Sequence, residues 1–573
     1  MVAAVWQTLP EMLEAQAAAY PDRMVFTHLE RGEDVGQSLT FAEVLRQARR
    51  CAAGLQRTTS LGDRVMLVFP NEPDFIVALL ACVLAGLVAV PAAPPRNART
   101  LDRLRNLADT AGARMVIVSE HLRGVFQKLG QADLAQGEWV FVGDLPPTDV
   151  AAFRPPHLSA QSIAVLQFTS GSTGNQKGVM VTHGNILHNC RVLSNPCGTG
   201  DAMRMVSWLP FFHDWGLVGC LFLPLWSGGS CHFFDPADFL RRPRRWLEAI
   251  SLHRATVACA PNFAYALCTG TADEGGPRLD LSGWRLAMIG AEPVRHDTIE
   301  GFAAAFASAG FRPNALFPSY GLAENTLMAT GGHDHAAPIY LRLDRIALAA
   351  GRAVLATATQ PESQTGLWVG CGQALLDQTV LIVDPKTRQP RADAEVGEVW
   401  IAGGSVTAGY WGRADDTAAS FHATLANRAD PRFLRTGDLG FLWQAELFIC
   451  GRLKDVVIKA GANFLAEDLE LSILRADPGL RVGCGAAFSL DIAGTERMVL
   501  VHEVNYGKKP ELPRLVGAIQ RAVSEDHGVM ADAIVIVAPG SLEKTSSGKI
   551  RRQHIKLQFE RGELDPLWLW QSW

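Results

Sequence analysis

The segment LQFTSGSTGNQKGVMVTH, residues 166–183, constrains this chain more than any other. It combines hydroxyl residues, glycines and one lysine, namely Thr169, Ser170, Gly171, Ser172, Thr173, Gly174 and Lys177. Glycine lets the backbone turn tightly enough for N–H groups and hydroxyls to converge on an anion, and lysine adds positive charge. The segment therefore predicts a polyphosphate-binding loop.

The loop is not a Walker A motif, which needs a glycine directly before its lysine. Here Gln176 precedes Lys177 and Gly178 follows it. Apolar, β-branched runs at 163–168 and 179–181 flank the loop, so we expect it to join two strands. A plain surface loop is the alternative, since Gly/Ser clusters are common there. Further motifs of related chemistry downstream favour the phosphate site.

A chain of 573 residues is too long to fold around a single hydrophobic core, so we expect at least two domains. A net charge of −5 without a long charged block gives no electrostatic case for nucleic acid. The four arginines near the middle of the chain are expected to form a solvated helix face; they are Arg241, Arg242, Arg244 and Arg245.

The eleven cysteines are scattered and form no Cys-x-x-Cys pair. Residues 1–16 lack a basic segment and contain Glu11 and Glu14, so they do not resemble a secretory signal. In a large chain of this kind the thiols are expected to be reduced, which predicts a cytoplasmic protein.

The apolar segment 75–93 reaches the length of a membrane span. Acidic residues precede it, Gly86 interrupts it and prolines follow it. We therefore predict a buried helix to about Ala85, a turn and a strand at 87–90, and no membrane span.

Helix and strand patterns alternate through the first 450 residues. A capping box at 40–43 begins an amphipathic helix, and strand-like runs follow at 64–69, 115–118 and 139–142. This alternation predicts an α/β fold with layered subdomains and a largely parallel sheet. From about Gln378 strands separated by turns, at 379–383, 397–402, 433–435 and 447–449, predict a β-rich subdomain.

The last part of the chain has the pattern of a small α+β domain. A helix is predicted at 466–474, and strands are predicted at 485–489, 498–504 and 533–537. We place the boundary near Lys454, which divides the chain into a large N-terminal domain, 1–453, and a small mobile C-terminal domain, 454–573. The tryptophans of the tail, Trp568, Trp570 and Trp573, are expected either to cover an apolar surface or to contact a partner.

Seven further motifs follow the loop, in the order SWLPFFHDWGL (207–217), APNFAY (260–265), GAEPVR (290–295), SYGLAE (319–324), RTGDL (435–439), GRLKD (451–455) and KTSSGKIRR (544–552). Together with the loop they resemble the adenylate-forming superfamily of acyl-CoA synthetases, peptide-synthetase adenylation domains and luciferases. The resemblance runs from about residue 10 to about 560. The fold and chemistry of that superfamily are therefore expected here.

Within the superfamily the chain is most similar to the fatty acyl-AMP ligases. The similarity is carried by HDWGL at 213–217, by the stretch 239–265, and by an inserted segment at about 331–368 whose core is 339–348. Such ligases carry an insertion there that coenzyme A ligases lack. The resemblance implies activation of a fatty acid and transfer of the acyl group to a carrier protein.

The resemblance implies roles for individual residues around ATP. The loop from Thr169 to Lys177 would hold the β- and γ-phosphates, and Glu324 would bind Mg²⁺. Asp438 would accept both ribose hydroxyls, and Arg452 would reach the ribose and the phosphate end. The adenine slot would be formed by Gly290, Ala291, Glu292, Ser319, Tyr320, Gly321 and Leu322, with the Tyr320 ring against the base.

The resemblance also implies a catalytic cation and an acyl site. Lys549 would bring an ammonium to the α-phosphate and the attacking carboxylate, and His213 would stand at the gate to the acyl carboxylate. The remaining acyl-site residues are Asp214, Trp215, Asn262 and Phe263. Asn175-Gln176 replaces a common proline, which is expected to alter the rigidity of the loop more than its charge. Trp215 stands where these ligases usually have methionine and could narrow or bend an acyl tunnel, so the preferred chain length stays open.

Several of these residues also have purely structural explanations. A carboxylate at a helix start is the alternative for Glu324, a core aromatic is the alternative for Tyr320, and a satisfied structural histidine is the alternative for His213. Lys549 also fits an exposed basic tail beside Arg551 and Arg552. The pair His333 and His335 has no further ligands at metal-binding spacing, so a solvated loop is expected there.

The sequence thus predicts an ATP- and Mg²⁺-dependent ligase that converts a fatty acid into fatty acyl-AMP and pyrophosphate. The acyl group would pass to the phosphopantetheine thiol of a separate acyl carrier protein, because no carrier domain is expected within the chain. The alternatives are a long- or medium-chain acyl-CoA synthetase and, less favoured, a stand-alone amino-acid adenylation enzyme. A non-catalytic nucleotide-binding module and a membrane transporter built on 75–93 are the remaining alternatives.

Overall fold

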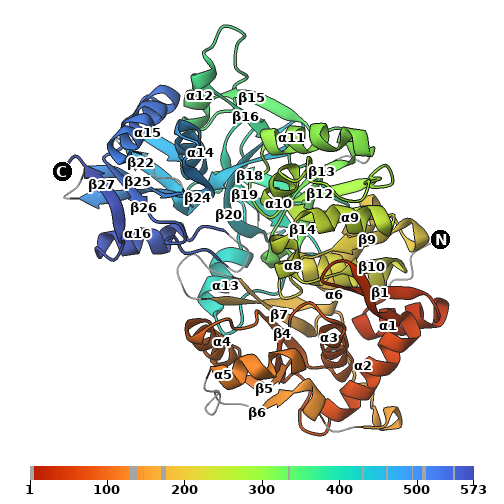
Figure 1. Ribbon diagram of the computed structural model, residues 1–573. Coiled ribbons are helices and arrows are strands. Elements are labelled where there is room, and N and C mark those ends of the chain that lie inside the picture. The colour runs from red at the N-terminus through yellow and green to blue at the C-terminus, as the bar shows by residue number, and fades with distance from the viewer. Residues whose placement is uncertain are drawn as a thin grey trace.

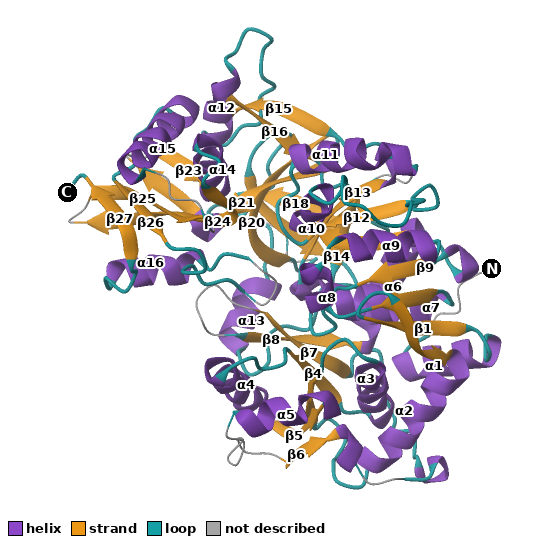
Figure 2. Cartoon of the chain, in the orientation of Figure 1, coloured by secondary structure: helices purple, strands orange, loops and turns teal. Residues whose placement is uncertain are grey.

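A computed structural model describes most of the chain, and Figure 1 and Figure 2 show its arrangement. The described residues are 6–129, 138–145, 148–169, 176–332, 336–426, 428, 431–459, 462–492, 495–505, 507, 511–545 and 549–573. Two large sheets form the greater part of the chain, and a smaller sheet with its own helices ends it.

The first large sheet has six strands in the order β6-β5-β3-β4-β7-β8 and is parallel except between β7 and β8. Its strands are β3 (Arg64–Val68), β4 (Val88–Ala92), β5 (Ala113–Val118), β6 (Glu138–Phe141), β7 (Ile163–Thr169) and β8 (Lys177–Thr182). Alternate residues of β3 enter two different hydrophobic cores, with Val65 and Leu67 in one and Met66 and Val68 in the other, and helices complete each core. The sheet is therefore covered on both faces, as the βα alternation predicts.

The helices of this region are α1 (Leu9–Ala19), α2 (Phe41–Leu55), α3 (Pro73–Ala85), α4 (Ala98–Ala111) and α5 (Arg123–Lys128). The predicted capping box begins α2, because Glu43 N donates to Thr40 Oγ1 at 3.2 Å and Thr40 N donates to Glu43 Oε2 at 2.9 Å. The apolar segment 75–93 forms buried α3 and β4, and left-handed Gly86 ends the helix. Within the described residues, no helix is long and apolar enough to cross a membrane.

The second large sheet has nine strands in the order β17-β14-β13-β12-β11-β9-β10-β1-β2. The six neighbouring strands β13-β12-β11-β9-β10-β1 run parallel. The antiparallel strands lie at the two edges, with β2 beside β1 at one edge and β14 and β17 beside β13 at the other. The strands are β1 (Met24–Glu30), β2 (Asp34–Thr40), β9 (Arg204–Ser207), β10 (Ser230–Phe233), β11 (Val257–Pro261), β12 (Leu286–Gly290), β13 (Leu316–Gly321), β14 (Met328–Gly331) and β17 (Gln373–Ala374).

The helices of this second region are α6 (His183–Cys197), α7 (Leu223–Ser227), α8 (Pro236–Arg241), α9 (Arg244–Leu252), α10 (Asn262–Thr269) and α11 (His296–Phe306). One continuous hydrophobic core joins α1–α3, α6 and the strands of the second sheet. The expectation of a solvated arginine face is wrong for Arg244, which is only 6% exposed. Its guanidinium donates to the carbonyls of Thr271 and Pro277, so main-chain oxygens take the place of water as hydrogen-bond acceptors.

The predicted β-rich region contains a four-stranded antiparallel sheet, β18-β19-β20-β21. Its strands are β18 (Thr379–Val383), β19 (Gly397–Ala402), β20 (Leu434–Trp443) and β21 (Glu446–Arg452), and α13 (Ala414–Phe421) precedes β20. The inserted segment contributes β15 (Tyr340–Asp344) and α12 (Arg345–Ala349), and β15 pairs with β16 (Thr365–Val369). Leu341, Leu343 and Leu348 of the insertion pack against Phe441 and Phe448 of this sheet. His333 and His335 lie outside the described residues.

The final part begins with the hairpin of β22 (Val456–Lys459) and β23 (Ala462–Leu465). A four-stranded sheet follows, made of β24 (Leu480–Ile492), β25 (Thr495–Val504), β26 (Ala533–Val537) and β27 (Pro566–Gln571), together with α14 (Ala466–Ala476), α15 (Leu512–His527) and α16 (Arg552–Glu560). This part has hydrophobic cores of its own, which agrees with the predicted α+β composition.

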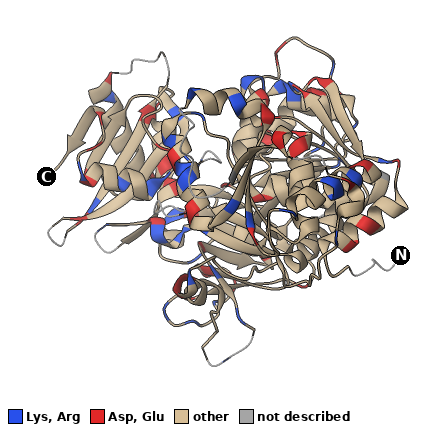
Figure 3. Ribbon diagram, turned by 90° about the horizontal axis from the view of Figure 1, so that it is seen from below, with Lys and Arg blue, Asp and Glu red and all other residues tan. Residues whose placement is uncertain are grey.

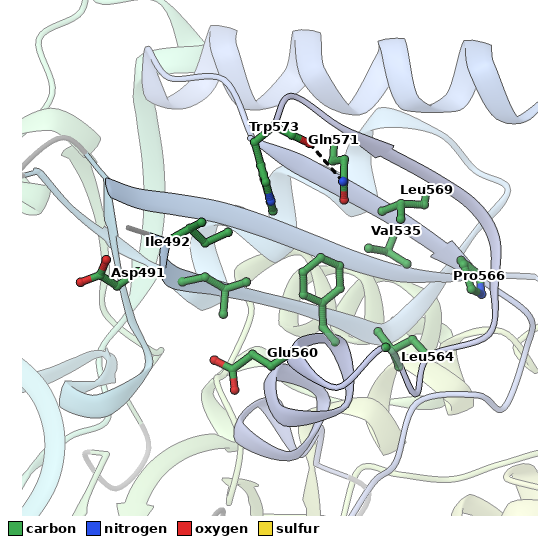
Figure 4. Close-up of a pocket in the computed structure, with 12 residues that line it drawn as sticks. Asp491, Ile492, Val535, Glu560, Leu564, Pro566, Leu569, Gln571 and Trp573 are labelled. Atoms are coloured by element: carbon green, nitrogen blue, oxygen red, sulfur yellow. Dashed lines mark hydrogen bonds between the residues drawn. The ribbon is translucent and has the colours of Figure 1, made fainter. Parts of the chain in front are cut away.

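The tryptophan-rich tail forms the edge strand β27, which pairs with β26 and which the sequence pattern does not predict. A pocket of about 400 Å³ lies between β27, α16 and the end of β24 (Figure 4). Trp573 and Gln571 stand at its rim, where Gln571 Nε2 donates to the carbonyl of Trp573 at 3.1 Å. No residue of the predicted active-site motifs lines this pocket, so the chemistry lies elsewhere.

Candidate active site

The predicted phosphate-binding loop connects two antiparallel strands, as its flanks predict. Strands β7 and β8 pair from Ile163↔Thr182 to Thr169↔Lys177, so Thr169 and Lys177 stand opposite each other where the hairpin leaves the sheet. Ser170, Gly171, Ser172, Thr173 and Gly174 lie outside the described residues. The two ends of the loop are therefore placed at one sheet edge, with the lysine on the returning strand.

Lys177 belongs to a group that includes Glu324. Lys177 Nζ lies 3.0 Å from Asp416 Oδ1 and 4.6 Å from the centre of the Tyr410 ring. The Tyr410 phenol donates a 2.8 Å hydrogen bond to Glu324 Oε1, and the main-chain N–H of Thr407 donates to the Glu324 carbonyl. The lysine predicted to bind phosphate and the predicted metal ligand thus share Tyr410 as a neighbour.

Tyr410 is a site residue that the sequence analysis does not identify. Its segment lies against β8, because Met180 N donates to the Gly409 carbonyl and Trp411 N donates to the Gly178 carbonyl. Burial, followed by the charge of Glu324, raises the pKa of Tyr410 above its usual range, so the phenol keeps its proton. The only signal in the sequence is an aromatic pair between glycines at 409–412.

The predicted adenine slot lies at the ends of two neighbouring strands. Strand β12 ends at Gly290 and the parallel strand β13 ends at Gly321, so both motifs leave the sheet at the same edge. A Cβ on Gly290 would lie 2.7 Å from the carbonyl oxygen of Ser319, and one on Gly321 would lie 1.8 Å from the Leu327 oxygen. Both positions require glycine because neighbouring backbone lies too close for a side chain.

Glu292 connects this slot with the predicted acyl-site motif. The main-chain N–H of Phe263 donates to Glu292 Oε1 at 2.6 Å, and Arg295 N donates to Asn262 Oδ1 at 2.9 Å. Burial raises the pKa of the Glu292 carboxyl, although the Phe263 N–H and the charge of Lys549 oppose the shift. Two motifs about thirty residues apart therefore form one wall of the site.

Asp438 and Arg452 face each other on paired strands. Residues Asp438 of β20 and Arg452 of β21 are register partners, and Arg452 Nε lies 3.0 Å from Asp438 Oδ1. The phenol of Tyr320 donates to the other carboxylate oxygen at 2.7 Å. The Asp438 charge raises the pKa of Arg452 above its usual range, and burial together with that charge raises the pKa of Tyr320. Both carboxylate oxygens of Asp438 thus have a fixed partner.

His213 pairs with its neighbour in sequence. His213 Nδ1 lies 2.6 Å from Asp214 Oδ1, and the N–H of Trp215 donates to the same carboxylate oxygen at 2.7 Å. Burial raises the pKa of Asp214, but the charges of His213 and Lys549 and these hydrogen bonds outweigh burial, and the pKa lies below its usual value. Gln167 Nε2 of β7 donates to the Phe212 carbonyl, which connects this turn to the phosphate-loop strand.

A π-helical segment, Trp215–Phe222, follows the histidine and is buried along its length. Such segments are rare and are often found at functional sites. Gly216 is required here, because a Cβ would lie 2.1 Å from the Pro210 carbonyl oxygen. Nearby, the Trp208 ring stacks on Phe239 with centres 3.9 Å apart. Large aromatic side chains therefore form the interior next to His213.

Lys549 lies close to the other predicted active-site residues. Its pKa is lowered by burial and then by the positive charge of Arg452, while Asp214, Asp438 and Glu292 act in the opposite direction. These charges belong to four different motifs, so the C-terminal part presents its lysine to the site formed by the larger part. The Lys549 side chain is exposed to solvent, so the lowered pKa reflects the protein atoms that surround the ammonium and not its exclusion from water.

The carboxylates of the site do not form a metal centre by themselves. Among the described residues, no group of three or more metal-ligating side chains is found. Glu324 offers a single carboxylate, which suits Mg²⁺ when phosphate oxygens and water supply the other positions.

Comparison with known proteins identifies the family. Residues 13–411 match the AMP-binding enzyme family, and residues 454–567 match the AMP domain of Disco-interacting protein 2-like proteins. A medium-chain-fatty-acid–[acyl-carrier-protein] ligase of Moorena producens is 38% identical, over 98% of this chain and 96% of the relative. A second such ligase, from Teredinibacter turnerae, is 32% identical over 96% of this chain and 93% of the relative.

A solved structure shows the same arrangement of the whole chain. The fatty acyl-adenylate ligase from L. pneumophila in complex with acyl adenylate and pyrophosphate is 32% identical, with a TM-score of 0.76 over 99% of this chain and 98% of that one. The predicted α/β architecture is therefore confirmed, and so is the predicted adenylating activity. This chain belongs to the AMP-binding enzyme family and, within it, to the fatty acyl-AMP ligases, which join a fatty acid to AMP.

Proposed function

We propose that this ligase activates a medium-chain fatty acid with ATP and Mg²⁺ and then passes the acyl group to the phosphopantetheine thiol of a separate acyl carrier protein. The observation that carries the proposal is the approach of Lys549 to Asp214, Asp438 and Glu292, which belong to the predicted acyl, ribose and adenine sites. The ligase of Moorena producens supports the choice of substrate and acceptor, since its name states both.

The first step joins a carboxylate to a polyanion, so catalysis requires charge neutralisation and correct alignment. A fatty acid oxygen attacks the α-phosphorus, the bond from that phosphorus to the β-phosphate oxygen breaks, and pyrophosphate leaves. Asp438 accepts from the ribose hydroxyls, and Tyr320 and Arg452 hold its carboxylate in orientation. Lys549 offsets the charge that develops between the two reactants.

Thr169, Lys177 and the loop between them bind the departing phosphates. Glu324 supplies one carboxylate to Mg²⁺, which neutralises phosphate charge when it is bound. The hydrogen bond from Tyr410 fixes the orientation of that carboxylate, and it joins the metal ligand to the lysine that faces the same phosphates. The adenine base lies in the slot of Gly290, Ala291, Ser319, Gly321 and Leu322.

The second step uses a thiol. The sulfur attacks the acyl carbonyl carbon, the bond from that carbon to the phosphate oxygen breaks, and AMP leaves. Lys549 has to leave the site so that the thiol can enter, and rotation of the C-terminal domain about Lys454 provides this movement.

Reduced thiols and ATP occur together in the cytoplasm, which is the compartment we propose. All eleven cysteines lie in described residues and none forms a disulfide.

The medium chain length is supported by the buried aromatic residues beside His213. Trp215 is 4% exposed and Trp208 is 3% exposed, and Phe263 lies against the Trp208 ring at 6.1 Å between centres. Side chains of this size occupy volume that a long acyl chain would need.

A panel of saturated fatty acids from four to eighteen carbons tests the proposal, with pyrophosphate release measured for each. We expect the rate to peak at medium length, and we expect thioester formation on a phosphopantetheine-bearing carrier protein to exceed that on coenzyme A. A peak at long chains would contradict the proposed substrate. Rapid formation of the coenzyme A thioester would favour an acyl-CoA synthetase instead.

A further inference from the structure

The larger part of the chain and the C-terminal part are joined by a charge contact that none of the roles above uses. Glu543 precedes Lys549 by six residues, and its carboxylate binds two arginines of α4. Arg99 Nη2 contacts Glu543 Oε1, and Arg103 Nη2 lies 3.3 Å from Glu543 Oε2. The two partners are more than 400 residues apart in the chain, so the contact depends on how the two parts are placed.

The two arginines are well placed for a shared partner. They are four residues apart on α4 and therefore lie on the same face, one turn above the other. Asn97 begins the helix with a capping box, in which Thr100 N donates to Asn97 Oδ1 at 2.9 Å. The helix is anchored in the larger part by Leu101, Leu104 and other buried residues. The arginines thus project from a rigid support.

Glu543 is equally well fixed on its own side. Arg551 Nη1 lies 2.6 Å from Glu543 Oε2, and the N–H of Arg551 donates to the Glu543 carbonyl at 3.1 Å. His554 lies 3.5 Å from the same oxygen. The Glu543 side chain is only 15% exposed, in contrast to the 67% and 46% of Arg99 and Arg103. Burial raises its pKa, but the charges of His554, Arg99, Arg103 and Arg551 outweigh burial and lower it.

Lys549 lies within the segment that this contact encloses. Thr545 N donates to the Lys549 carbonyl at 2.8 Å, and Lys549 N donates to Thr545 Oγ1 at 3.0 Å. Lys544 and Ile550 form an antiparallel bridge just inside the Glu543–Arg551 pair. A force that holds Glu543 against α4 therefore also holds the backbone of Lys549 in place.

Arg552, which follows Arg551, connects the segment 543–551 to the predicted hinge at Lys454. Its guanidinium contacts Asp455 at 2.9 Å and Glu470 at 2.6 Å. Arg551 and Arg552 thus contact different acidic groups, one beside α4 and one beside the hinge. Acidic and basic residues lie side by side where the C-terminal part meets the rest of the chain (Figure 3). These two arginines are not an exposed basic tail.

We propose that Arg99, Arg103 and Glu543 form a latch that positions Lys549 for adenylate formation and opens before the thiol step. The proposal rests on the two-step function above, because only that function requires Lys549 to enter and leave. The latch residues are positioning residues, since they act through Lys549 and do not touch the reacting groups. Opening the latch exposes three charges that water readily solvates, so the contact is suited to being made and broken repeatedly.

The test compares the two half-reactions in the full-length protein. Octanoate and ATP give the rate of octanoyl adenylate formation in a single turnover, and synthetic octanoyl adenylate with pantetheine gives the rate of thiol transfer. The double variant Arg99→Gln/Arg103→Gln is expected to lose about tenfold in the first rate, equivalent to about 1.4 kcal/mol, and nothing in the second. Arg105→Gln is the matched control, because Arg105 is on the same helix but pairs with Asp102 at 2.9 Å.

A second variant separates a positioning role from a purely structural one. Glu543→Gln is expected to show the same loss in the first half-reaction only, and combining it with Arg99→Gln/Arg103→Gln is expected to add no further loss. Equal losses in both half-reactions, no loss in either, or fully additive losses would each overturn the latch. A wild-type protein that forms no octanoyl adenylate would contradict the proposed function, whereas an active wild type with unaffected variants would contradict the latch alone.

Discussion

The phenol of Tyr320 donates a 2.7 Å hydrogen bond to the carboxylate of Asp438, although 118 residues separate the two in the chain. Tyr320 lies on β13 of the second large sheet, and Asp438 lies on β20 of the β-rich region. The bond joins the predicted adenine and ribose sites into one rigid surface. It also leaves Asp438 with a phenol on one oxygen and Arg452 on the other.

Removing the phenol hydroxyl of Tyr320 is expected to lower kcat/KM for ATP. Tyr320→Phe removes one hydrogen bond to the Asp438 carboxyl group, so we expect kcat/KM for ATP to fall about fivefold to thirtyfold, or about 1–2 kcal/mol. Asp438→Asn should cost more, because it also removes the charge partner of Arg452. Steady-state kinetics with varied ATP measures both. Tyr340→Phe in the inserted segment is the matched control, since that phenol donates to Glu300 of α11 at 3.1 Å. An equal loss in Tyr340→Phe would contradict the assignment.

Glu324→Gln is expected to raise the Mg²⁺ concentration that the enzyme requires for activity. The variant keeps the shape of the side chain but removes the charge that the metal binds. We expect the Mg²⁺ concentration for half-maximal adenylate formation to rise about tenfold, which is about 1.4 kcal/mol of binding. Tyr410→Phe should give a smaller rise in the same direction, because it frees the carboxylate to rotate. The exposed Glu362→Gln serves as the control, and an unchanged Mg²⁺ dependence in Glu324→Gln would contradict the metal role.

The lowered pKa of Lys549 predicts loss of activity on the alkaline side. Burial and the charge of Arg452 lower the pKa of this ammonium below the usual lysine value of 10.5 in the enzyme without nucleotide. The cation is the active form, so kcat/KM for ATP should fall as pH rises through the lowered pKa. Lys549→Arg should retain some activity and show no such fall, because a guanidinium stays charged. The same alkaline decline in Lys549→Arg would mean that another group titrates.

A buried histidine predicts loss of stability in mild acid. His183 is 1% exposed, its Nδ1 accepts from the N–H of Leu9 at 3.2 Å, and burial lowers its pKa to about 4 from 6.5. The unfolded chain therefore binds the proton first as pH falls below 6.5, and stability declines until about pH 4. From pH 7 to pH 5 this one group should cost about 2 kcal/mol.

The variant His183→Asn provides the comparison, because its side-chain oxygen can accept from Leu9 without titrating. Denaturant unfolding at pH 7 and pH 5 should show a smaller acid loss in the variant, by about 2 kcal/mol. An equal loss in both proteins would mean that His183 does not contribute. His232, whose pKa burial also lowers to about 4, is present in both and cancels in the comparison.

The local features of the fold follow from the sequence because their causes are local. The capping box of Thr40 and Glu43, the buried helix that ends at Gly86, and the strands on both sides of the phosphate loop are all confirmed. Each depends on residues within one or two turns, whose pattern is visible in the chain. The strand at 379–383 is found with the predicted bounds.

The remaining features depend on contacts between distant segments. The sequence does not indicate that Arg244 is buried and donates hydrogen bonds to two main-chain carbonyls. Nor does it indicate that the tryptophan-rich tail forms the edge strand β27 of a sheet. Tyr410 becomes a site residue only because its segment lies against β8, and Glu543 acquires its partners only when α4 is beside it. Such pairings are set by tertiary packing, which single-chain periodicity does not report.

The most direct test of the account is adenylate formation by Lys549→Ala. A single-turnover assay with octanoate and ATP, together with equilibrium binding of ATP, separates chemistry from nucleotide binding. We predict that the variant forms no detectable octanoyl adenylate and binds ATP nearly as tightly as the wild type, because the site of Asp438, Tyr320 and Lys177 is intact. Adenylate formation at the wild-type rate would contradict the role of the lysine and, with it, the charge-neutralisation mechanism.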